Sequence, residues 1–413
     1  MLSKEENICC FALLAVGVDY ADAWGRTVQE RCLMIYLDNA ATTMVKPPQV
    51  IEAVTSAMNS FGGVGRGVHG ASISAGMAVF EAREQIAKLF NAPDASRVCF
   101  CANATQALNT AIFGMANPGD HIVTTYASHN SVLRPLYHLN EIYGNGIAAV
   151  KIAPDGSLDL GAFERAFESP TKLVVITHAS NLTGDIYDVA ALAEVAHAYG
   201  ARVVVDVAQT AGVESIDMQQ MGADVLCFTG HKGLMGPQGT GGIVLAQDVE
   251  IRPLMVGGTG SHSFDMEHPQ SYPDHLEAGT LNSHGIAGLA AGVSFVLEQG
   301  VDAIAKHDRM LAQRFCDGLE CIPSAKHYGG AIAARTGIVA MNIGSLDSAL
   351  VADALANDYG ICTRAGAHCA PLMHKALGTC DQGAVRFSFG WYNTQEDVDA
   401  ALNALAHIAA ANR

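Results

Sequence analysis

The alternation of short apolar strands with helical segments constrains the fold of this chain more than any other feature. Helices are expected between the strands, near residues 105–116, 129–142, 158–168, 187–199 and 216–221. The strands themselves are expected at residues 97–101, 121–125, 173–177, 202–206, 225–229 and 242–246. This order predicts an α/β fold whose mainly parallel sheet is covered by helices on both faces. Because ligands bind such sheets at the carboxyl ends of the strands, the residues that follow each strand are the first candidates for a site.

The rest of the chain predicts a second, smaller α+β domain. A long loop rich in Gly, Ser, His and Pro covers about residues 253–282. Outside the alternating region we expect strands at 35–37, 336–343 and 382–389, and helices at 47–59, 75–90, 283–299, 303–320, 347–358 and 395–411. With 413 residues, two domains are expected. We assign residues 49–296 to a large domain, and residues 34–48 with 297–413 to a small one.

Composition excludes several classes of function. Hydrophobic residues make up 50% of the chain and charged residues 16%, which is typical of a globular protein with a large core. The 24 basic and 41 acidic residues give a net charge of −17, which disfavours broad binding to nucleic acid or anionic membranes. The 11 cysteines are scattered without a C-x-x-C pair, and Cys99, Cys227 and Cys362 are expected to be small buried hydrophobes. We therefore expect no disulfide scaffold and a cytoplasmic location.

The first 33 residues are interpreted as an extension of unknown role. The stretch from Ile8 to Val18 is apolar, but it is too short to span a bilayer as a helix. Glu5 and Glu6 cancel the charge of Lys4, whereas a secretory signal needs a positive start. We predict neither secretion nor a membrane anchor, and Met34 is a possible natural start.

The stretch from Asp224 to Leu245 places one lysine at the end of a core strand. The apolar run V-L-C-F is followed by T-G-H-K and then by a glycine-rich turn. A phosphate-binding loop would place its lysine after the glycines, whereas here Gly233 follows Lys232. Desolvation at such a position lowers the pKa of the lysine, and a neutral amine can condense with an aldehyde. This stretch alone leaves a structural lysine and a Schiff-base lysine carrying pyridoxal phosphate (PLP) equally open.

Other strand ends carry polar groups that also have two interpretations. Asp206 ends a strand and either caps a helix or pairs with a pyridinium nitrogen, which makes a cofactor ring an electron sink. The free backbone N–H groups at Ala104 and the hydroxyl of Thr105 form an anion cradle, although capping by Asn103 fits the same geometry. His129 is either structural or a flat platform for an aromatic ring.

The small domain contributes a short polar loop with one cysteine. Arg364 and His368 lie near Cys369 in the sequence and are expected to favour its thiolate, although an unreactive loop cysteine is equally consistent with this stretch. Arg386 lies in a predicted strand and offers a guanidinium fork suited to a carboxylate.

Taken together, these segments resemble the class V aminotransferase-like PLP enzymes, and within them the cysteine desulfurases. The resemblance runs from about Met34 to the C-terminus. It rests on Y-L-D-N-A-A-T-T at 36–43, R-G-V-H at 66–69, S-H-N-S at 128–131, H-A-S-N-L-T-G at 178–184, V-D-V-A-Q at 205–209, T-G-H-K at 229–232, E-A-G-T at 277–280, R-A-G-A-H-C-A at 364–370, V-R-F-S at 385–388 and Y-N-T at 392–394. It implies the fold type I of PLP-dependent transferases, with a mainly parallel seven-stranded sheet in the large domain, and a homodimer.

The resemblance also implies a role for each matching residue around the cofactor. Lys232 would be the Schiff-base lysine, Asp206 the partner of the ring nitrogen, and His129 the stacking and catalytic histidine. The remaining cofactor-binding residues would be Gln209 at the phenolic oxygen, Ala104, Thr105, Thr229 and His231 at the phosphate, and Thr280 reaching the phosphate of the partner subunit. Asn181 follows another strand and could donate either to the phenolic oxygen or to a substrate carboxylate. No metal site is expected.

For the substrate, the resemblance implies L-cysteine bound through its α-carboxylate. Arg386 would clamp this carboxylate, with Asn39, Ala40, Asn181, Arg364 and His368 nearby. Cys369 falls on the nucleophilic cysteine that would receive the sulfur as a persulfide and pass it to an acceptor protein, as in iron–sulfur cluster biogenesis. The cysteine loop is similar to that of the group II enzymes, which include SufS-type desulfurases and selenocysteine lyases.

Two departures from the family pattern affect these expectations. Ser128 stands where a glutamate commonly precedes the stacking histidine, and Pro371 follows Ala370 one residue earlier than in the SufS-type pattern. Three other functions remain open: a selenocysteine lyase, another PLP-dependent C–S lyase, and a PLP-binding regulator without turnover. Alanine formation from L-cysteine separates the desulfurase from the regulator.

Overall fold

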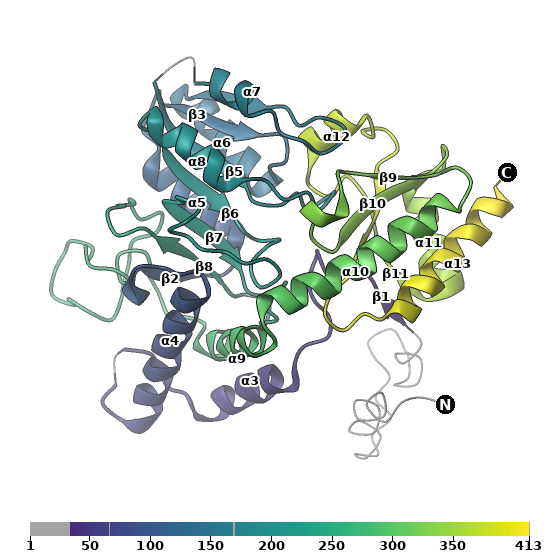
Figure 1. Ribbon diagram of the computed structural model, residues 1–413. Coiled ribbons are helices and arrows are strands. Elements are labelled where there is room, and N and C mark those ends of the chain that lie inside the picture. Colours follow the sequence, from purple (N-terminus) through teal and green to yellow (C-terminus); the bar gives the residue numbers. More distant parts are fainter. Residues whose placement is uncertain (1–33, 66, 168–169, 413) are drawn as a thin grey trace.

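A seven-stranded, a four-stranded and a two-stranded β-sheet with their covering helices form the structure, a computed structural model that describes residues 34–65, 67–167 and 170–412 (Figure 1). The predicted N-terminal extension and Arg66 lie outside these described residues. Within them, no single helix is long and apolar enough to cross a membrane. One pair, α9 (Ser283–Gln299) and α10 (Val301–Glu320), passes that test of length and composition when its two helices are taken together across a bend of 81°.

The larger sheet has seven strands in the order β2-β8-β7-β6-β5-β3-β4. Only β8 runs antiparallel to its neighbours, so the predicted α/β fold with a mainly parallel sheet is confirmed. The strands are β2 Val98–Cys101, β3 His121–Thr125, β4 Gly146–Val150, β5 Thr171–Thr177, β6 Arg202–Asp206, β7 Val225–Thr229 and β8 Gly241–Leu245.

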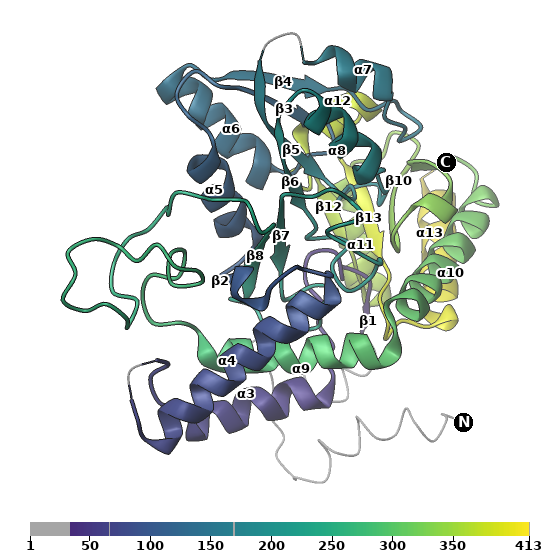
Figure 2. The same ribbon diagram turned by 60° about the vertical axis from the view of Figure 1, so that its left-hand side comes forward.

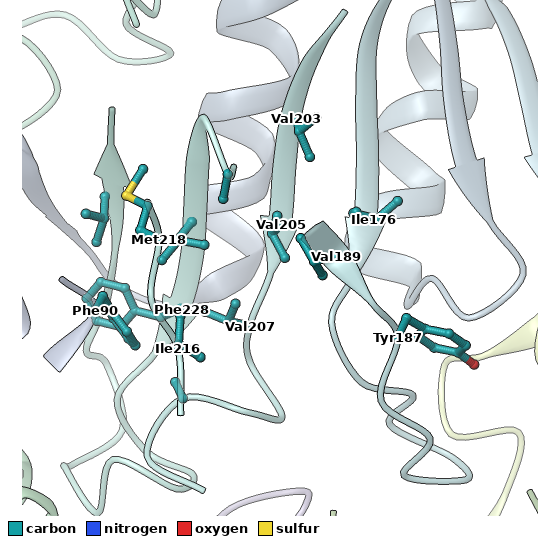
Figure 3. Packing of buried hydrophobic residues seen from close by; sticks show 14 of the residues in the cluster. Phe90, Ile176, Tyr187, Val189, Val203, Val205, Val207, Ile216, Met218 and Phe228 are labelled. Atoms are coloured by element: carbon teal, nitrogen blue, oxygen red, sulfur yellow. The ribbon is translucent and has the colours of Figure 1, made fainter. Parts of the chain in front are cut away.

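Helices cover both faces of this sheet, which explains why its strands are apolar throughout. Val203 and Val205 of β6 point to the face covered by α4, α7, α8 and α9, whereas Val204 points to the face covered by α5 and α6 (Figures 2 and 3). Val203 and Val204 are both fully buried. The covering helices are α4 Gly70–Leu89, α5 Ala104–Met115, α6 Asn130–Tyr143, α7 Leu160–Arg165, α8 Val189–Ala198 and α9 Ser283–Gln299. Helix α3 (Pro48–Ser60) packs against α9.

The smaller sheet is antiparallel, with the order β12-β13-β10-β9, and has its own core. Strand β1 (Ile35–Tyr36) pairs with β11 (Ile361–Cys362), which brings the first described residues to this second core. The remaining elements are α10 Val301–Glu320, β9 Ala325–Tyr328, β10 Ile338–Ile343, α11 Ser348–Tyr359, β12 Arg364–Gly366, α12 Pro371–Leu377, β13 Ala384–Ser388 and α13 Gln395–Ala411. The predicted domain boundary at residue 296 falls inside α9.

The helix expected at residues 216–221 is wrong. The Asp217 carboxylate accepts hydrogen bonds from the backbone N–H groups of Gln219 and Gln220, a local pattern that competes with a helix. Ile216 and Met218 are buried in the core. The apolar spacing that predicted a helix therefore belongs to an irregular segment that packs against the core. Strands β4, β9, β11 and β12 and helix α12 were not expected; all are short.

Candidate active site

A cavity lies at the carboxyl ends of β5, β6 and β7, where the parallel sheet was expected to bind its ligand. Eleven of the predicted site residues line this cavity or an adjoining one that shares Gln209 and Lys232 with it. Its lining residues are Asn103, Ala104, Thr105, His129, Ser131, Thr177, Ala179, Asn181, Asp206, Ala208, Gln209, Thr229, His231 and Lys232. The adjoining cavity adds Asn39 and Ala40. The structure thus brings together residues that are up to 193 positions apart, from Asn39 to Lys232.

A larger surface hollow, of about 600 Å³, lies at the opposite end of the sheet. Its charged groups already have partners: the Arg202 guanidinium contacts Asp224 at 2.6 Å and Asp248 at 2.7 Å, and Arg252 donates to Asn117 at 2.8 Å. Unlike the cavity at Lys232, this hollow has its arginine side chains already bound to other described residues.

Lys232 and Asp206 form the charged centre of the cavity. Burial lowers the pKa of Lys232 to about 8, while the Asp206 carboxylate acts in the opposite direction. Asp206 is 5% exposed, and burial raises the pKa of its carboxyl, although the Ala208 N–H at 2.9 Å and the charge of Lys232 oppose this rise. A cationic group placed against Asp206 would restore its ionised form.

One end of the cavity is built from hydrogen-bond donors. Asn103 caps α5 by accepting from the Gln106 N–H at 2.9 Å, so the backbone N–H groups of Ala104 and Thr105 remain directed at the cavity end. His231 Nδ1 is buried without a partner among the described residues. Burial first, and then Lys232 and Lys46, lower the pKa of His231 to about 4. These donors are suited to an anion, and this part of the cavity is named the anion-binding end.

His129 is a neutral imidazole that lies at the start of α6. Burial lowers its pKa to about 4, and the charges of Lys232, Arg364 and Arg386 act in the same direction. Its Nδ1 atom accepts the backbone N–H of Ser131 at 3.0 Å, which places the ring proton on Nε2. His129 therefore presents a neutral N–H donor.

Polar contacts orient the neighbouring residues. Gln209 donates through Nε2 to the Ala40 carbonyl at 3.2 Å, and the Ala40 N–H donates to Ser388 Oγ at 2.9 Å. Asn181 donates to the His368 carbonyl at 2.7 Å, while its buried Oδ1 has no partner among the described residues. Asn39 donates to the Ser388 carbonyl at 2.9 Å.

Arg386 comes from β13 and reaches the large domain. Its guanidinium is 1% exposed and donates to Asp38 Oδ1 at 2.7 Å and to the Asn181 carbonyl at 2.9 Å, whereas Nε is buried without a partner in the described structure. Arg364 lies directly opposite Arg386 in the β12–β13 pair. Asp38 was missed as a site residue because its partner is 348 positions away, although it lies inside the Y-L-D-N-A-A-T-T block.

The Cys369 loop has an unusual backbone. His368 and Cys369 both have positive φ angles, 51° and 56°, which L-residues adopt at a cost of about 1–3 kcal/mol each. The Cys369 carbonyl accepts the Asn130 N–H at 2.8 Å, which fixes the half-buried cysteine beside the residue that follows His129. Pro371 begins α12, so the short spacing after Ala370 starts this helix immediately.

The structure corrects one electrostatic expectation and one expectation about burial. Burial lowers the pKa of His368 to about 3, and its Nε2 donates to the Arg364 carbonyl at 3.1 Å, so His368 is neutral and adds no positive charge near Cys369. Ser128, at the position of the missing glutamate, is fully buried and bonds Thr124 Oγ1 at 2.8 Å. Cys362 is half-buried, not fully buried as expected.

Two further residues complete the account of the site. Ser131 lines the cavity but was not predicted, although it lies two residues after His129 and belongs to the S-H-N-S block. Thr280 is exposed in the loop between β8 and α9 and does not line this chain's cavity. Among the described residues, no group of three His, Cys, Asp or Glu side chains is arranged to hold a metal ion.

Comparison with known proteins shows the family. The model of the family described as "Aminotransferase class-V" matches residues 35–401. A probable cysteine desulfurase of Methanothermobacter thermautotrophicus is 35% identical over 389 residues, which cover 91% of this chain and 94% of the relative. A cysteine desulfurase of an Enterobacter species is 33% identical and covers 91% and 93%.

Solved structures agree with these relatives. The apo structure of a cysteine desulfurase from Thermococcus onnurineus superposes with a TM-score of 0.86 at 33% identity and covers 92% of this chain and 95% of that one. The cysteine desulfurase CsdA of Escherichia coli superposes with a TM-score of 0.82 at 29% identity, covering 91% and 95%. The chain therefore belongs to the class-V aminotransferase family.

Proposed function

We propose that this protein is a PLP-dependent cysteine desulfurase, which converts L-cysteine to L-alanine and leaves the sulfur as a persulfide on Cys369. The observation that carries the proposal is the single cavity that joins Lys232 and Asp206 of the parallel sheet to an anion-binding end. Relatives named cysteine desulfurase over about nine tenths of the chain support the same activity.

The donor set fits PLP. Ala104, Thr105, Thr229 and His231 would hold the phosphate, since free N–H groups at the start of α5 and the unpartnered His231 Nδ1 suit an anion. Lys232 would bind the aldehyde, Asp206 the ring nitrogen, Gln209 and Asn181 the phenolic oxygen, and His129 one ring face. Bound there, PLP supplies an electron sink for the carbon chemistry of an amino acid.

Side chains of the protein would bind the substrate and move its proton. Arg386, aided by Arg364, would bind the α-carboxylate of the substrate, and Asn39 and Ala40 would shape the pocket beside it. Lys232, with a pKa of about 8, is suited to moving a proton at neutral pH because its pKa lies near the operating pH. His129 and His368 are neutral and would act as orienting groups or donors.

Sulfur transfer needs Cys369. Its thiolate would attack the sulfur of L-cysteine, so that the carbon–sulfur bond breaks as a sulfur–sulfur bond forms. The substrate carbon keeps the bonding electrons and takes up a proton, which yields alanine, and the sulfur stays on Cys369. A sulfur-acceptor protein would then take it in the cytoplasm.

We also propose a homodimer. Large apolar side chains are exposed on α3, α4 and the 253–282 loop, and exposed apolar side chains that gather on a surface mark protein–protein contacts. They are Ile51, Met58, Ile73, Met77, Phe80, Val256, Phe264 and Met266. Thr280 is exposed in the same loop, as it would need to be to reach the partner subunit's phosphate site.

Purified protein assayed with L-cysteine and with L-selenocysteine tests the function. Alanine and sulfide or selenide are measured together, for the wild type and for Cys369→Ala. We expect Cys369→Ala to keep the bound-cofactor absorbance and to lose turnover of L-cysteine. Full sulfur release by this variant would contradict the persulfide route. Retained turnover of L-selenocysteine alone would show a dual enzyme, because selenium leaves more readily than sulfur.

A further inference from the structure

Ser131 occupies a position between two parts of the site that the cofactor would join. Its Oγ atom lies 2.7 Å from Thr105 Oγ1, at the anion-binding end, and 3.0 Å from Nδ1 of His129, the ring platform. The same residue also donates its backbone N–H to His129 Nδ1 at 3.0 Å. Ser131 lines the cavity and is half-buried.

The direction of the Ser131 hydroxyl proton follows from these contacts. A neutral imidazole nitrogen without a proton has one lone pair, and the Ser131 amide already uses that of His129 Nδ1. The hydroxyl of Ser131 is therefore best satisfied by donating to Thr105 Oγ1. Thr105, having accepted this bond, is left with its own proton to donate into the cavity.

From this geometry we infer that Ser131 is a positioning residue for the anion-binding end of the site. It fixes the hydroxyl of Thr105 as a donor toward a bound phosphate, and it does so through Thr105, without touching the cofactor itself. The inference rests on the proposed PLP function. When two hydroxyl groups form a hydrogen-bonded chain that ends on an anion, each hydrogen bond polarises the next and strengthens it.

The backbone and the side chain of Ser131 can be separated by mutation. Ser131→Ala removes the hydroxyl but keeps the N–H that holds His129, so the ring platform should stay in place. Ser131→Thr keeps the hydroxyl and serves as the conservative control. Ser128→Ala is a matched control three residues earlier, because its hydroxyl contacts Thr124 and not the cavity.

The test measures how tightly the apoprotein binds PLP and how tightly it binds pyridoxal, which lacks the phosphate. Binding is monitored by the absorbance of the bound ring. We expect Ser131→Ala to weaken PLP binding by about fivefold, the value of one neutral hydrogen bond, and to leave pyridoxal binding unchanged. Ser131→Thr and Ser128→Ala should bind PLP as the wild type does. In the Thr105→Ala background, Ser131→Ala should cost nothing further, because its effect passes through Thr105.

Three results would overturn the inference: equal losses for PLP and pyridoxal, no loss for PLP, or additive losses in the Thr105→Ala, Ser131→Ala double variant. Thermal unfolding of each apoprotein separates a folding defect from a binding defect, since a positioning role predicts unchanged apoprotein stability. Failure of the wild type itself to bind PLP would instead refute the proposed function. The two failures are therefore distinguishable.

Discussion

Replacing Arg386 by Lys tests the proposed binding of the substrate carboxylate. Arg386 already uses two donors, toward Asp38 at 2.7 Å and Asn181 at 2.9 Å, and its fork still has donors for a second carboxylate. Lysine keeps the charge but has no fork, so one charge-assisted hydrogen bond to the substrate is lost. Such a bond contributes about 1.5–3 kcal/mol, which predicts a loss in kcat/KM for L-cysteine of about 10–150-fold.

The assay compares alanine formation by Arg386→Lys and Arg364→Lys, with bound cofactor measured in both. We expect the larger loss, mainly as a raised KM, in Arg386→Lys with cofactor binding retained. If Arg364→Lys lost more, the clamp would be Arg364. If neither variant changed KM, the reasoning about the carboxylate would be refuted. Because Arg386 is 1% exposed, its replacement should also destabilise the fold, by about 1–3 kcal/mol for an unpaired buried group.

Three other predictions concern stability and assembly. Burial raises the pKa of the Asp308 carboxyl well above its usual value. Above about pH 4 the folded protein therefore keeps a proton on Asp308 that the unfolded chain has lost. Consequently the free energy of unfolding falls as the pH rises from about 4 toward the pKa that Asp308 has in the folded protein. Asp308→Asn should therefore raise the Tm more at pH 8 than at pH 5; an equal shift at both would contradict this. Gly184→Ala should lower the free energy of unfolding by about 1–3 kcal/mol, because Gly184 has a φ of +80° and the added Cβ would meet the Ile338 carbonyl oxygen at 2.8 Å. An unchanged midpoint in a urea titration would contradict this prediction. Met77→Glu with Phe80→Glu should produce monomers in light scattering, and a persistent dimer would place the interface elsewhere.

The parts of the site that sequence predicted are those that local pattern determines. Lys232 and Asp206 each follow or end an apolar strand. Because parallel strands end at the same edge of a sheet, residues at their carboxyl ends lie close together regardless of the connecting loops. Asp38 and Ser131 were missed because their importance depends on partners elsewhere in the chain. Asp38 meets Arg386 across 348 positions, and Ser131 meets Thr105 across 26.

The errors in the fold and in the electrostatics share a cause. The spacing of Ile216 and Met218 fits a helix, but Asp217 binds the neighbouring backbone and the two apolar side chains pack without one. Likewise, the sequence places His368 near Cys369 but does not show its burial, and burial removes its charge. Tertiary contacts determine both the backbone around Asp217 and the charge of His368. A sequence pattern shows which residues are neighbours along the chain but does not show these contacts.

Charge in the cavity explains why Lys232 would serve in more than one role in the proposed reaction. The histidines His129, His231 and His368 are all neutral, since burial lowers each pKa to about 4 or below. They cannot act as cationic acids at neutral pH, and Asp206 is committed by its burial to pairing with a positive group. Among the described residues that line the cavity, Lys232 has a pKa of about 8, which is close enough to neutrality for it to gain and lose a proton readily. The residue that would anchor the cofactor is therefore also the one best suited to move the substrate's proton.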